Sequence, residues 1–246
     1  LEVNPRASRT VPFVAKATGV PWAKLAAKVM AGLSLDELDI HEAPRPTQTS
    51  VKESVFPFTK FPGVDVILGP EMRSTGEVMG IDMSFGLAFA KSQMAALSPL
   101  PTSGTIFISV CDADKAGIVP VAQRLAALGF TLQATGGTQT VIQAAGVTCG
   151  RTFKFGEGRP NVADLITNDE VDLLINTPTS RGPTTDEGKI RAMATVHNVP
   201  LITTLTGAEA ATTALEALLA GTSDHDVAGH AWGVRPLQEY FEQFKK

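Results

Sequence analysis

The chain has 246 residues, more than one average domain, so between one and two domains are expected. Its 43% hydrophobic and 19% charged residues are typical of a soluble globular protein and exclude a disordered or fibrous one; no stretch approaches the roughly 18 consecutive apolar residues of a membrane span. The net charge of −4 provides no broad basic field, which argues against nucleic acid and membrane surfaces as partners.

The first hundred residues predict mixed α and β structure. Strands are expected at 1–4 and from Ser50, where SVKESVFPF alternates apolar and polar residues. Helices are expected at 12–17, 21–31 and 84–96, with Pro21 at a first helical position. The polar, proline-containing phrase HEAPRPTQT is expected to be a loop.

The phrase LSPLPTSG, at 97–104, has the prolines, serines and glycine of a linker, so we place a domain boundary there. Beyond it, short apolar runs alternate with amphipathic helical phrases. The expected strands are 105–110, 130–135, 151–155, 171–177 and 200–204. The expected helices are 115–128, 138–145, 162–167, 187–197 and 208–220.

Five successive strand and helix pairs predict a five-stranded parallel sheet flanked by helices, because parallel neighbours need crossover connections. The predicted fold class is therefore α/β, preceded by an α+β segment. Ligands of such sheets bind beyond the carboxyl ends of the strands, so candidate site residues are sought just after each strand.

Glu2 and Asn4 are two residues apart on the first expected strand, so their side chains share one face. A carboxylate and an amide oxygen are suitable ligands for Mg²⁺ bound to nucleotide phosphates, and Arg6 and Arg9 are placed to contact the same phosphates. The alternative is an exposed strand end with scattered charges.

The phrase TGGT, at 135–138, follows a strand and opens a helix. Its glycines let the backbone approach a ligand, and Thr135, Thr138 and the free N–H groups of the helix start form an anion site. Lys115 follows the first strand of this domain and Lys154 the third, so both are expected at the same edge of the sheet. Singly, each lysine is more often a solvated surface residue; together they favour a phosphate pocket.

Polar residues also follow the fourth strand of this domain. Asn176, Thr177, Thr179 and Arg181 suit contacts with a ribose or a base. Asp186 suits either a ligand contact or the cap of the next helix, and both interpretations stay open.

Two long phrases resemble a known family. EVNPRASRTVPFVAKATGVPWAKLAAKVMAG resembles the last metal-binding strand and following helix of the second ATP-grasp module in carbamoyl-phosphate synthetase large subunits, and VKESVFPFTKFPGVDVILGPEMRSTGEVMG resembles the next stretch. The resemblance implies that residues 1–96 end the ATP-grasp module. Residues 97–104 are then a linker, and 105–246 form a methylglyoxal-synthase-like allosteric domain.

The resemblance implies a cytoplasmic ATP-dependent ligase that makes carbamoyl phosphate from bicarbonate and glutamine-derived ammonia, for pyrimidine and arginine biosynthesis. It implies that Glu2 and Asn4 bind the Mg²⁺ or Mn²⁺ of ATP. The remaining parts would be the upstream ATP-grasp modules of the same chain and a glutaminase small subunit. This segment alone is expected to need no cofactor and to make no carbamoyl phosphate.

The resemblance also implies that a nucleotide effector such as UMP or IMP binds the second domain. Six residues match the family's phosphate- and nucleotide-contacting positions: Lys115, Thr135, Thr138, Lys154, Asn176 and Thr177. The phrase KFGEGRPN likewise resembles the family's lysine followed by EGRP.

Ornithine control is less well supported by the resemblance. Glu53 falls where the family binds this activator, although a solvated strand residue is the alternative. Bacterial relatives pair an acid with a threonine near the last strand-to-helix turn, where this chain has Ile202 and Thr203. The retained lysines and threonines argue against a vertebrate-like response to N-acetylglutamate.

The same fold occurs in methylglyoxal synthase and in a purine cyclohydrolase module, so a phosphate-eliminating lyase is an alternative function. Methylglyoxal synthase needs an aspartate base in a GGD-like turn, where this chain reads GEGRPNVADL; a carboxylate is present at Glu157, but the motif is not. A free-standing nucleotide-binding module is a further alternative.

Cysteine usage and the first residues complete the expectations. Cys111 and Cys149 form no CxxC pair, so neither a disulfide framework nor a thiolate zinc site is expected, which fits a reducing cytoplasm. The chain starts with Leu1 inside a strand-like phrase, which is typical of a segment cut from a longer polypeptide.

Overall fold

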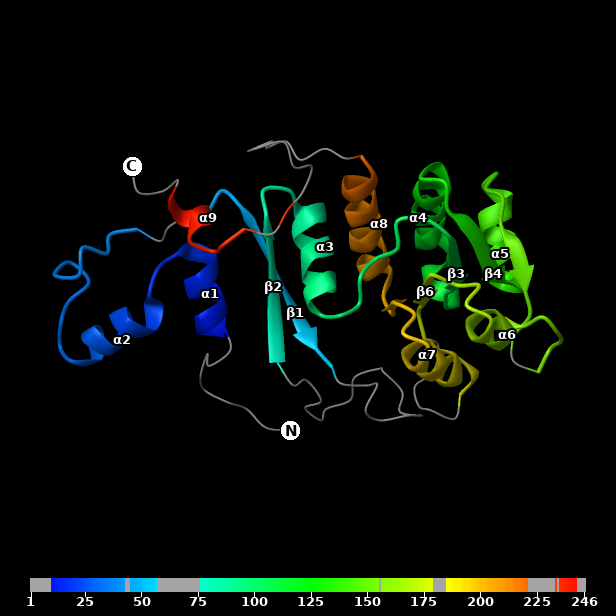
Figure 1. The fold of residues 1–246 in the computed structure, drawn as a ribbon, viewed down its shortest axis with the longest axis horizontal. Helices are drawn as coiled ribbons and strands as arrows, with labels where there is room; N and C mark the ends of the chain where they lie inside the picture. Colours follow the sequence, from blue (N-terminus) through cyan, green and yellow to red (C-terminus); the bar gives the residue numbers. More distant parts are fainter. Residues whose placement is uncertain are drawn as a thin grey trace.

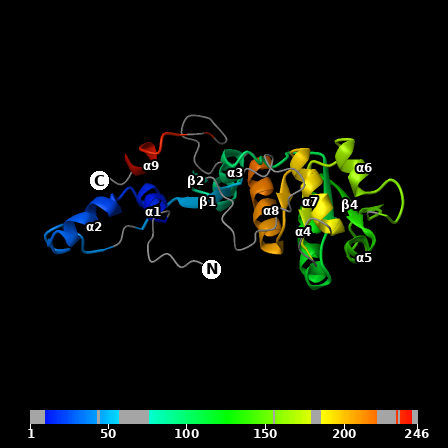
Figure 2. The ribbon, with the colours of Figure 1, turned by 90° about the horizontal axis from the view of Figure 1, so that it is seen from below.

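The computed structural model describes residues 10–42, 45–56, 76–154, 156–178, 185–220, 233 and 235–242. They form an elongated molecule, with two helices at one end, a small sheet beside them and a larger sheet at the other end (Figures 1 and 2). Within these residues, no helix combines the length and apolar character needed to cross a bilayer.

The first part of the chain combines helices with a two-stranded sheet. The elements are α1 (Thr10–Thr18), α2 (Trp22–Met30), β1 (Thr49–Val55), β2 (Gly76–Asp82) and α3 (Phe85–Ala95), and β1 pairs antiparallel with β2. The three helices and the strand from Ser50 were expected within about two residues. Pro21 precedes α2 as its N-cap instead of starting the helix. The expected strand 1–4 lies outside the described residues.

Strand β2 is missing from the prediction. Its sequence GEVMGID has two glycines and no strict alternation, and its place in the structure comes from pairing with β1. Helix α3 covers this pair on one side and packs against α8 (Leu205–Leu219) on the other (Figure 1). A Cβ on Gly80 would overlap the carbonyl oxygen of Ala88, and one on Gly86 would lie 2.7 Å from that of Thr213. Glycine therefore lets α3 approach both neighbours at backbone distance.

The larger sheet has five parallel strands in the order β5-β4-β3-β6-β7. Its strands are β3 (Thr105–Ser109), β4 (Thr131–Thr135), β5 (Gly150–Thr152), β6 (Leu173–Asn176) and β7 (Leu201–Ile202). Besides α8, the helices are α4 (Lys115–Ala127), α5 (Gly136–Ala144), α6 (Val162–Thr167) and α7 (Asp186–Val196), and a short 3₁₀ turn spans Asp112–Asp114. The predicted α/β class with a five-stranded parallel sheet is confirmed.

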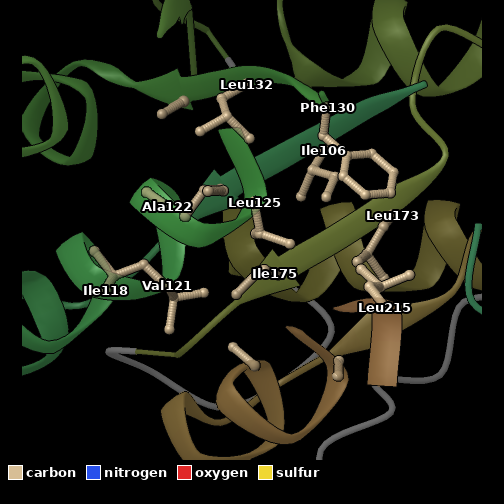
Figure 3. Packing of buried hydrophobic residues seen from close by; sticks show 14 of the residues in the cluster. Ile106, Ile118, Val121, Ala122, Leu125, Phe130, Leu132, Leu173, Ile175 and Leu215 are labelled. Atoms are coloured by element: carbon tan, nitrogen blue, oxygen red, sulfur yellow. The ribbon is translucent and has the colours of Figure 1, made fainter. Parts of the chain in front are cut away.

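Both faces of the larger sheet are buried. Ile106, Ile108 and Ile175 cluster with side chains of α4, α5 and α8, while Phe107 and Leu174 cluster with α6 and α7 on the opposite face. This alternation follows from the period of two along a strand. Figure 3 shows the first cluster, in which strand side chains meet those of α4 and α8. The two helical layers therefore hold the sheet rigidly beneath the loops at its edges.

Several boundaries differ from the expectation. The strand expected at 151–155 ends at Thr152, because Phe153 makes only an isolated bridge to Asn161 and the chain then turns at Gly156, whose φ is +77°. Helix α8 begins three residues earlier than expected, because the Thr204 side chain accepts a hydrogen bond from the Gly207 N–H and caps it. Residues 97–104 form neither helix nor strand.

The chain returns to its first part through α9 (Glu239–Glu242). The Tyr240 hydroxyl donates to the Ile81 carbonyl oxygen over 3.1 Å, and Lys91 Nζ lies 3.5 Å from the same hydroxyl. The Phe241 ring lies against Gly19, in the turn between α1 and α2. Tyr240 and Phe241 thus hold α9 against the first part of the chain.

Gly19 and Gly32 test how α9 is held. Both have positive φ, +72° and +101°, so alanine at either site should cost about 1–2 kcal/mol of backbone strain. Only at Gly19 would the new Cβ meet the Phe241 ring, at 2.9 Å. We expect Gly19→Ala to expose residues 235–242 to limited proteolysis, and Gly32→Ala to leave their protection unchanged. Equal cleavage of both variants would contradict this docking.

Candidate functional site

The strand order reverses direction at β3. The chain moves outward from β3 to β4 and β5, then returns to place β6 on the other side of β3 and β7 beyond it. The loops after β3 and β6 therefore leave the sheet in opposite directions, which opens a crevice at their carboxyl ends. The predicted site residues described below that come from residues 105–246 lie at strand ends, on loops or at helix starts, at this edge or next to it.

The loop after β3 gathers three of the predicted threonines. Thr135 Oγ1 lies 3.1 Å from the Ser109 hydroxyl, while Thr138 Oγ1 accepts a hydrogen bond from the Val110 N–H at 3.2 Å. Thr177 Oγ1 accepts one from the Cys111 N–H at 3.0 Å. The structure therefore brings together residues at or just after the ends of β3, β4 and β6, as the parallel topology predicted.

These three threonines are buried, with 1–3% of their surface exposed. Their hydroxyl oxygens are used to fix the loop after β3, a role that the sequence did not indicate. Thr138 and Thr177 accept these bonds and keep their own protons for donation, so a ligand contact stays chemically open to both. Whether a ligand makes such contacts remains a proposal.

Helix α5 starts at Gly136, two residues earlier than expected, so both glycines of TGGT lie in its first turn. Thr135 is the N-cap residue, but its side chain makes no capping hydrogen bond. The first N–H groups of a helix have no intrahelical acceptor and carry the positive end of its dipole, which suits an anion.

Lys115 extends to this turn. Its Nζ lies 2.9 Å from the position that a Cβ on Gly137 would occupy, so an alanine there would displace the amine. The same Nζ forms an ion pair of 2.6 Å with Asp112. The hydrogen bond and charge of Lys115, together with the charge of Lys154, hold the pKa of Asp112 below its usual value. Lys115 therefore pairs with a carboxylate beside the TGGT turn, the charge of Lys154 acts on the same carboxylate, and Asp112 was absent from the prediction.

Asn176 lies at the end of β6 and is fully buried. Its Nδ2 donates to the Ser109 carbonyl oxygen at 3.1 Å, and its Oδ1 accepts from Arg191 Nη1 at 2.8 Å. The side chain thus bridges two strands and α7. Arg191 is also fully buried and was not predicted. The available signal was its position three residues before Ala194, on the apolar face of α7.

Asp186 is the first residue of α7, but it does not cap the helix. Thr185 Oγ1 accepts from the Gly188 N–H at 3.0 Å and makes the cap. Asp186 instead pairs with Lys189 at 3.4 Å, in a first turn where the helix dipole favours a carboxylate. The cap interpretation of Asp186 is wrong, and its ligand role stays a prediction. Thr179 and Arg181 lie outside the described residues.

Glu53 and Thr203 belong to different parts of the molecule. Glu53 lies on β1, where its Oε2 accepts a hydrogen bond from Gln93 Nε2 at 2.9 Å. Burial raises the pKa of this carboxyl, although the Gln93 bond opposes the shift. Thr203 lies between β7 and α8. In the described ranges, no hydrogen bond or ion pair joins these two side chains.

Glu2, Asn4, Arg6 and Arg9 lie outside the described residues, so the predicted metal and phosphate contacts there stay predictions. Elsewhere, in the part of the chain that the structure describes, no group of three or more His, Cys, Asp and Glu side chains is arranged to hold a metal. Glu157 accepts from the Lys154 N–H at 3.2 Å and is exposed.

Comparison with known proteins identifies similar sequences for both parts of the chain. A model of the MGS-like domain matches residues 117–203, and a model of the carbamoyl-phosphate synthase L chain ATP-binding domain matches residues 1–38. A carbamoyl phosphate synthase large chain from Rhodopirellula baltica is 57% identical over 89% of this chain, and one from Mesorhizobium japonicum is 51% identical over 98%.

These alignments cover only 20% of either relative, so the chain spans about a fifth of the length of the proteins it matches. Among solved structures, a methylglyoxal synthase from Elizabethkingia anophelis is 25% identical, with a TM-score of 0.38, over 45% of this chain and 77% of that chain.

The hydrogen bond between Arg191 and Asn176 predicts that the protein loses stability when Arg191 is replaced. Arg191→Met leaves the buried Oδ1 of Asn176 without its guanidinium donor, which should lower the free energy of unfolding in urea by about 1–3 kcal/mol. Lys189→Met, on the exposed side of the same helix, removes a surface ion pair with Asp186 and should cost less than about 1 kcal/mol. Equal losses of unfolding free energy in the two variants would show that the buried hydrogen bond contributes no more to stability than the surface ion pair.

Glu53 predicts a pH effect. With its pKa raised in the folded state, the folded protein binds this proton more tightly than the unfolded chain does, so the contribution to stability falls as pH rises above about 4.5. Glu53→Gln should therefore unfold at higher urea than wild type at pH 8, and this advantage should shrink at pH 4. Exposed Glu42→Gln should show no such pH-dependent difference. An advantage of Glu53→Gln that is unchanged by pH would contradict the assignment.

Proposed function

Because this chain is similar to carbamoyl phosphate synthase large chains along nearly its whole length, as its sequence phrases predicted, we propose that it is the regulatory segment of such a protein. Its MGS-like domain would bind the phosphate of a nucleotide effector such as UMP or IMP at the start of α5. The proposal keeps the predicted division into residues 1–96, the linker 97–104 and residues 105–246.

One observation carries the proposal: the amine of Lys115 lies at Gly137, in the first turn of a helix whose N-cap side chain makes no capping bond. Lys154 adds a second positive charge that reaches the same Asp112. A phosphate there would accept bonds from the backbone N–H groups of α5 and from Lys115. The pair between Lys115 and Asp112 is open to solvent on the Asp112 side, so a phosphate can replace that carboxylate at small cost.

The crevice at β3 and β6 would take the rest of the nucleotide. Its walls would be formed by the loop after β3, which is fixed by four residues: Thr135, Thr138, Asn176 and Thr177. Asp186 lies at the start of α7. Since Asn176 already uses both ends of its amide, its effect on the nucleotide would come through the position of the strand ends.

The catalytic contribution of the segment would be small. Glu2 and Asn4 would hold the divalent cation of ATP, with Arg6 and Arg9 at its phosphates, and Mg²⁺ would neutralise phosphate charge. ATP-grasp modules of the same polypeptide and a glutaminase small subunit would supply the remaining machinery. The whole protein would then make carbamoyl phosphate from bicarbonate and glutamine-derived ammonia in the cytoplasm.

Calorimetric titration of the 246-residue chain tests the effector site. We expect UMP or IMP to bind at sub-millimolar concentration, and Lys115→Met to weaken that binding by about ten-fold or more, because a charged hydrogen bond is lost. Lys24→Met removes an exposed lysine of α2 and should bind like wild type. If neither nucleotide binds wild type at sub-millimolar concentration, the effector proposal fails for this chain.

The same titration separates the alternatives. Ornithine and N-acetylglutamate should give no heat that depends on Lys115, since Ile202 stands where bacterial relatives have an acid. Conversion of dihydroxyacetone phosphate to methylglyoxal, lost in Glu157→Gln, would instead support a lyase. Glu157 accepts a bond from the Lys154 N–H, so this variant must also be checked for nucleotide binding.

A further inference from the structure

A third cation lies beside the start of α5. Arg151, on the edge strand β5, places its Nε 3.5 Å and its Nη2 3.6 Å from the position that a Cβ on Gly136 would occupy. Gly136 and Gly137 are consecutive, and the second of them is faced by Lys115. The two glycines of the first turn therefore each admit a cationic group, one from β5 and one from the start of α4.

Among the described residues, the N–H donors of the Arg151 guanidinium are available to a ligand. Its Cζ lies 5.8 Å from the centroid of the Phe153 ring, a cation–π contact that positions the group without using its N–H donors. In the residues that the structure describes, the Arg151 guanidinium makes no hydrogen bond or ion pair, and only the backbone of Arg151 is paired, with β4. By contrast, Arg124 is held by Glu216 at 2.6 Å and Arg159 faces Asp164 at 3.6 Å.

The charges around this turn favour a doubly charged anion. Lys115 and Arg151 lie beside it, Lys115 pairs with Asp112, and the charge of Lys154 also acts on Asp112. A planar guanidinium presents two parallel N–H groups that match two oxygens of a phosphate, whereas an ammonium acts as a point charge. A phosphate monoester carries close to two negative charges at pH 7 and has oxygens for both kinds of partner.

We propose that Arg151 is a direct ligand of the anion at the start of α5, and that it makes this site selective for the dianionic phosphate of a monoester. The inference rests on the proposed effector site and deepens it, since it adds a residue that the sequence motifs did not indicate. Arg151 would bind two phosphate oxygens while Lys115 and the α5 backbone bind the others. A nucleoside without its phosphate would gain nothing from Arg151.

The test titrates UMP, inorganic phosphate and uridine into the 246-residue chain, with Arg151→Gln, Arg151→Lys and Arg159→Gln as variants. Arg151→Gln should weaken UMP and phosphate binding by about ten-fold, the loss of one charged hydrogen-bonding group. Arg151→Lys should lie between Gln and wild type, because it keeps the charge but loses the fork. Arg159→Gln, an exposed arginine of the same region, should bind like wild type.

The outcomes separate this inference from the proposed function. If wild type binds UMP and Arg151→Gln binds it equally well, Arg151 is not a ligand and the effector site stands without it. If wild type binds neither phosphate nor either nucleotide, UMP or IMP, both proposals are overturned. Binding of uridine as tight as that of UMP would also overturn the selectivity. Arg151 is exposed, so the variants should keep the wild-type melting temperature; should Arg151→Gln not fold, the affinity of Arg151→Lys decides.

Discussion

The hydrogen bonds of the Asn176 amide determine how the loops leave the larger sheet. The Ser109 carbonyl oxygen accepts both the Asn176 Nδ2 and the Thr177 N–H, so the ends of β3 and β6 are joined twice at one acceptor. Arg191 pairs with the other end of the amide from α7. A fully buried guanidinium is tolerated only where it has such partners, so the strand ends and α7 must keep their mutual positions. The loop after β3, with Lys115 beyond it, takes its direction from this arrangement.

The sequence was sufficient wherever the argument was local or followed from parallel topology. Alternation and turn residues predicted the strands and helices of the larger domain, and the carboxyl-edge rule placed Lys115 beside the TGGT turn. Prediction from the sequence failed where contacts between residues far apart in the chain determine the structure. Strand β2 exists because β1 pairs with it, and the burial of Arg191 depends on Asn176, fifteen residues earlier in the chain. No periodicity reports such contacts, because their energy comes from groups that meet only in the folded state.

The threonines show that residues of a candidate ligand site can also have a structural role. Thr135, Thr138 and Thr177 lie near the carboxyl edge of the larger sheet, and their hydroxyl oxygens contact Ser109, Val110 and Cys111. Residues that contact a ligand must also satisfy the backbone of the loop that carries them, since a buried N–H without an acceptor is costly. What is left for an anion is then the start of α5 and the cations around it. At the proposed effector site, this division of roles would make charge, more than the hydroxyl groups, the determinant of affinity.

Helix α3 gives a physical route between the two parts of the chain. Gly80 and Gly86 allow its backbone to meet β2 on one side and α8 on the other, so the backbones approach each other directly at these two positions. Closely packed elements move as one body, because a gap of even half an ångström loses much of their dispersion energy. Helix α8 begins just after β7, at the carboxyl edge that holds the proposed effector site. A shift of α8 there would be carried by α3 to β2, where Tyr240 of α9 binds the Ile81 carbonyl oxygen. Coupling by this route needs a change in the position of α8, and a nucleotide that left α8 in place would bind without regulating.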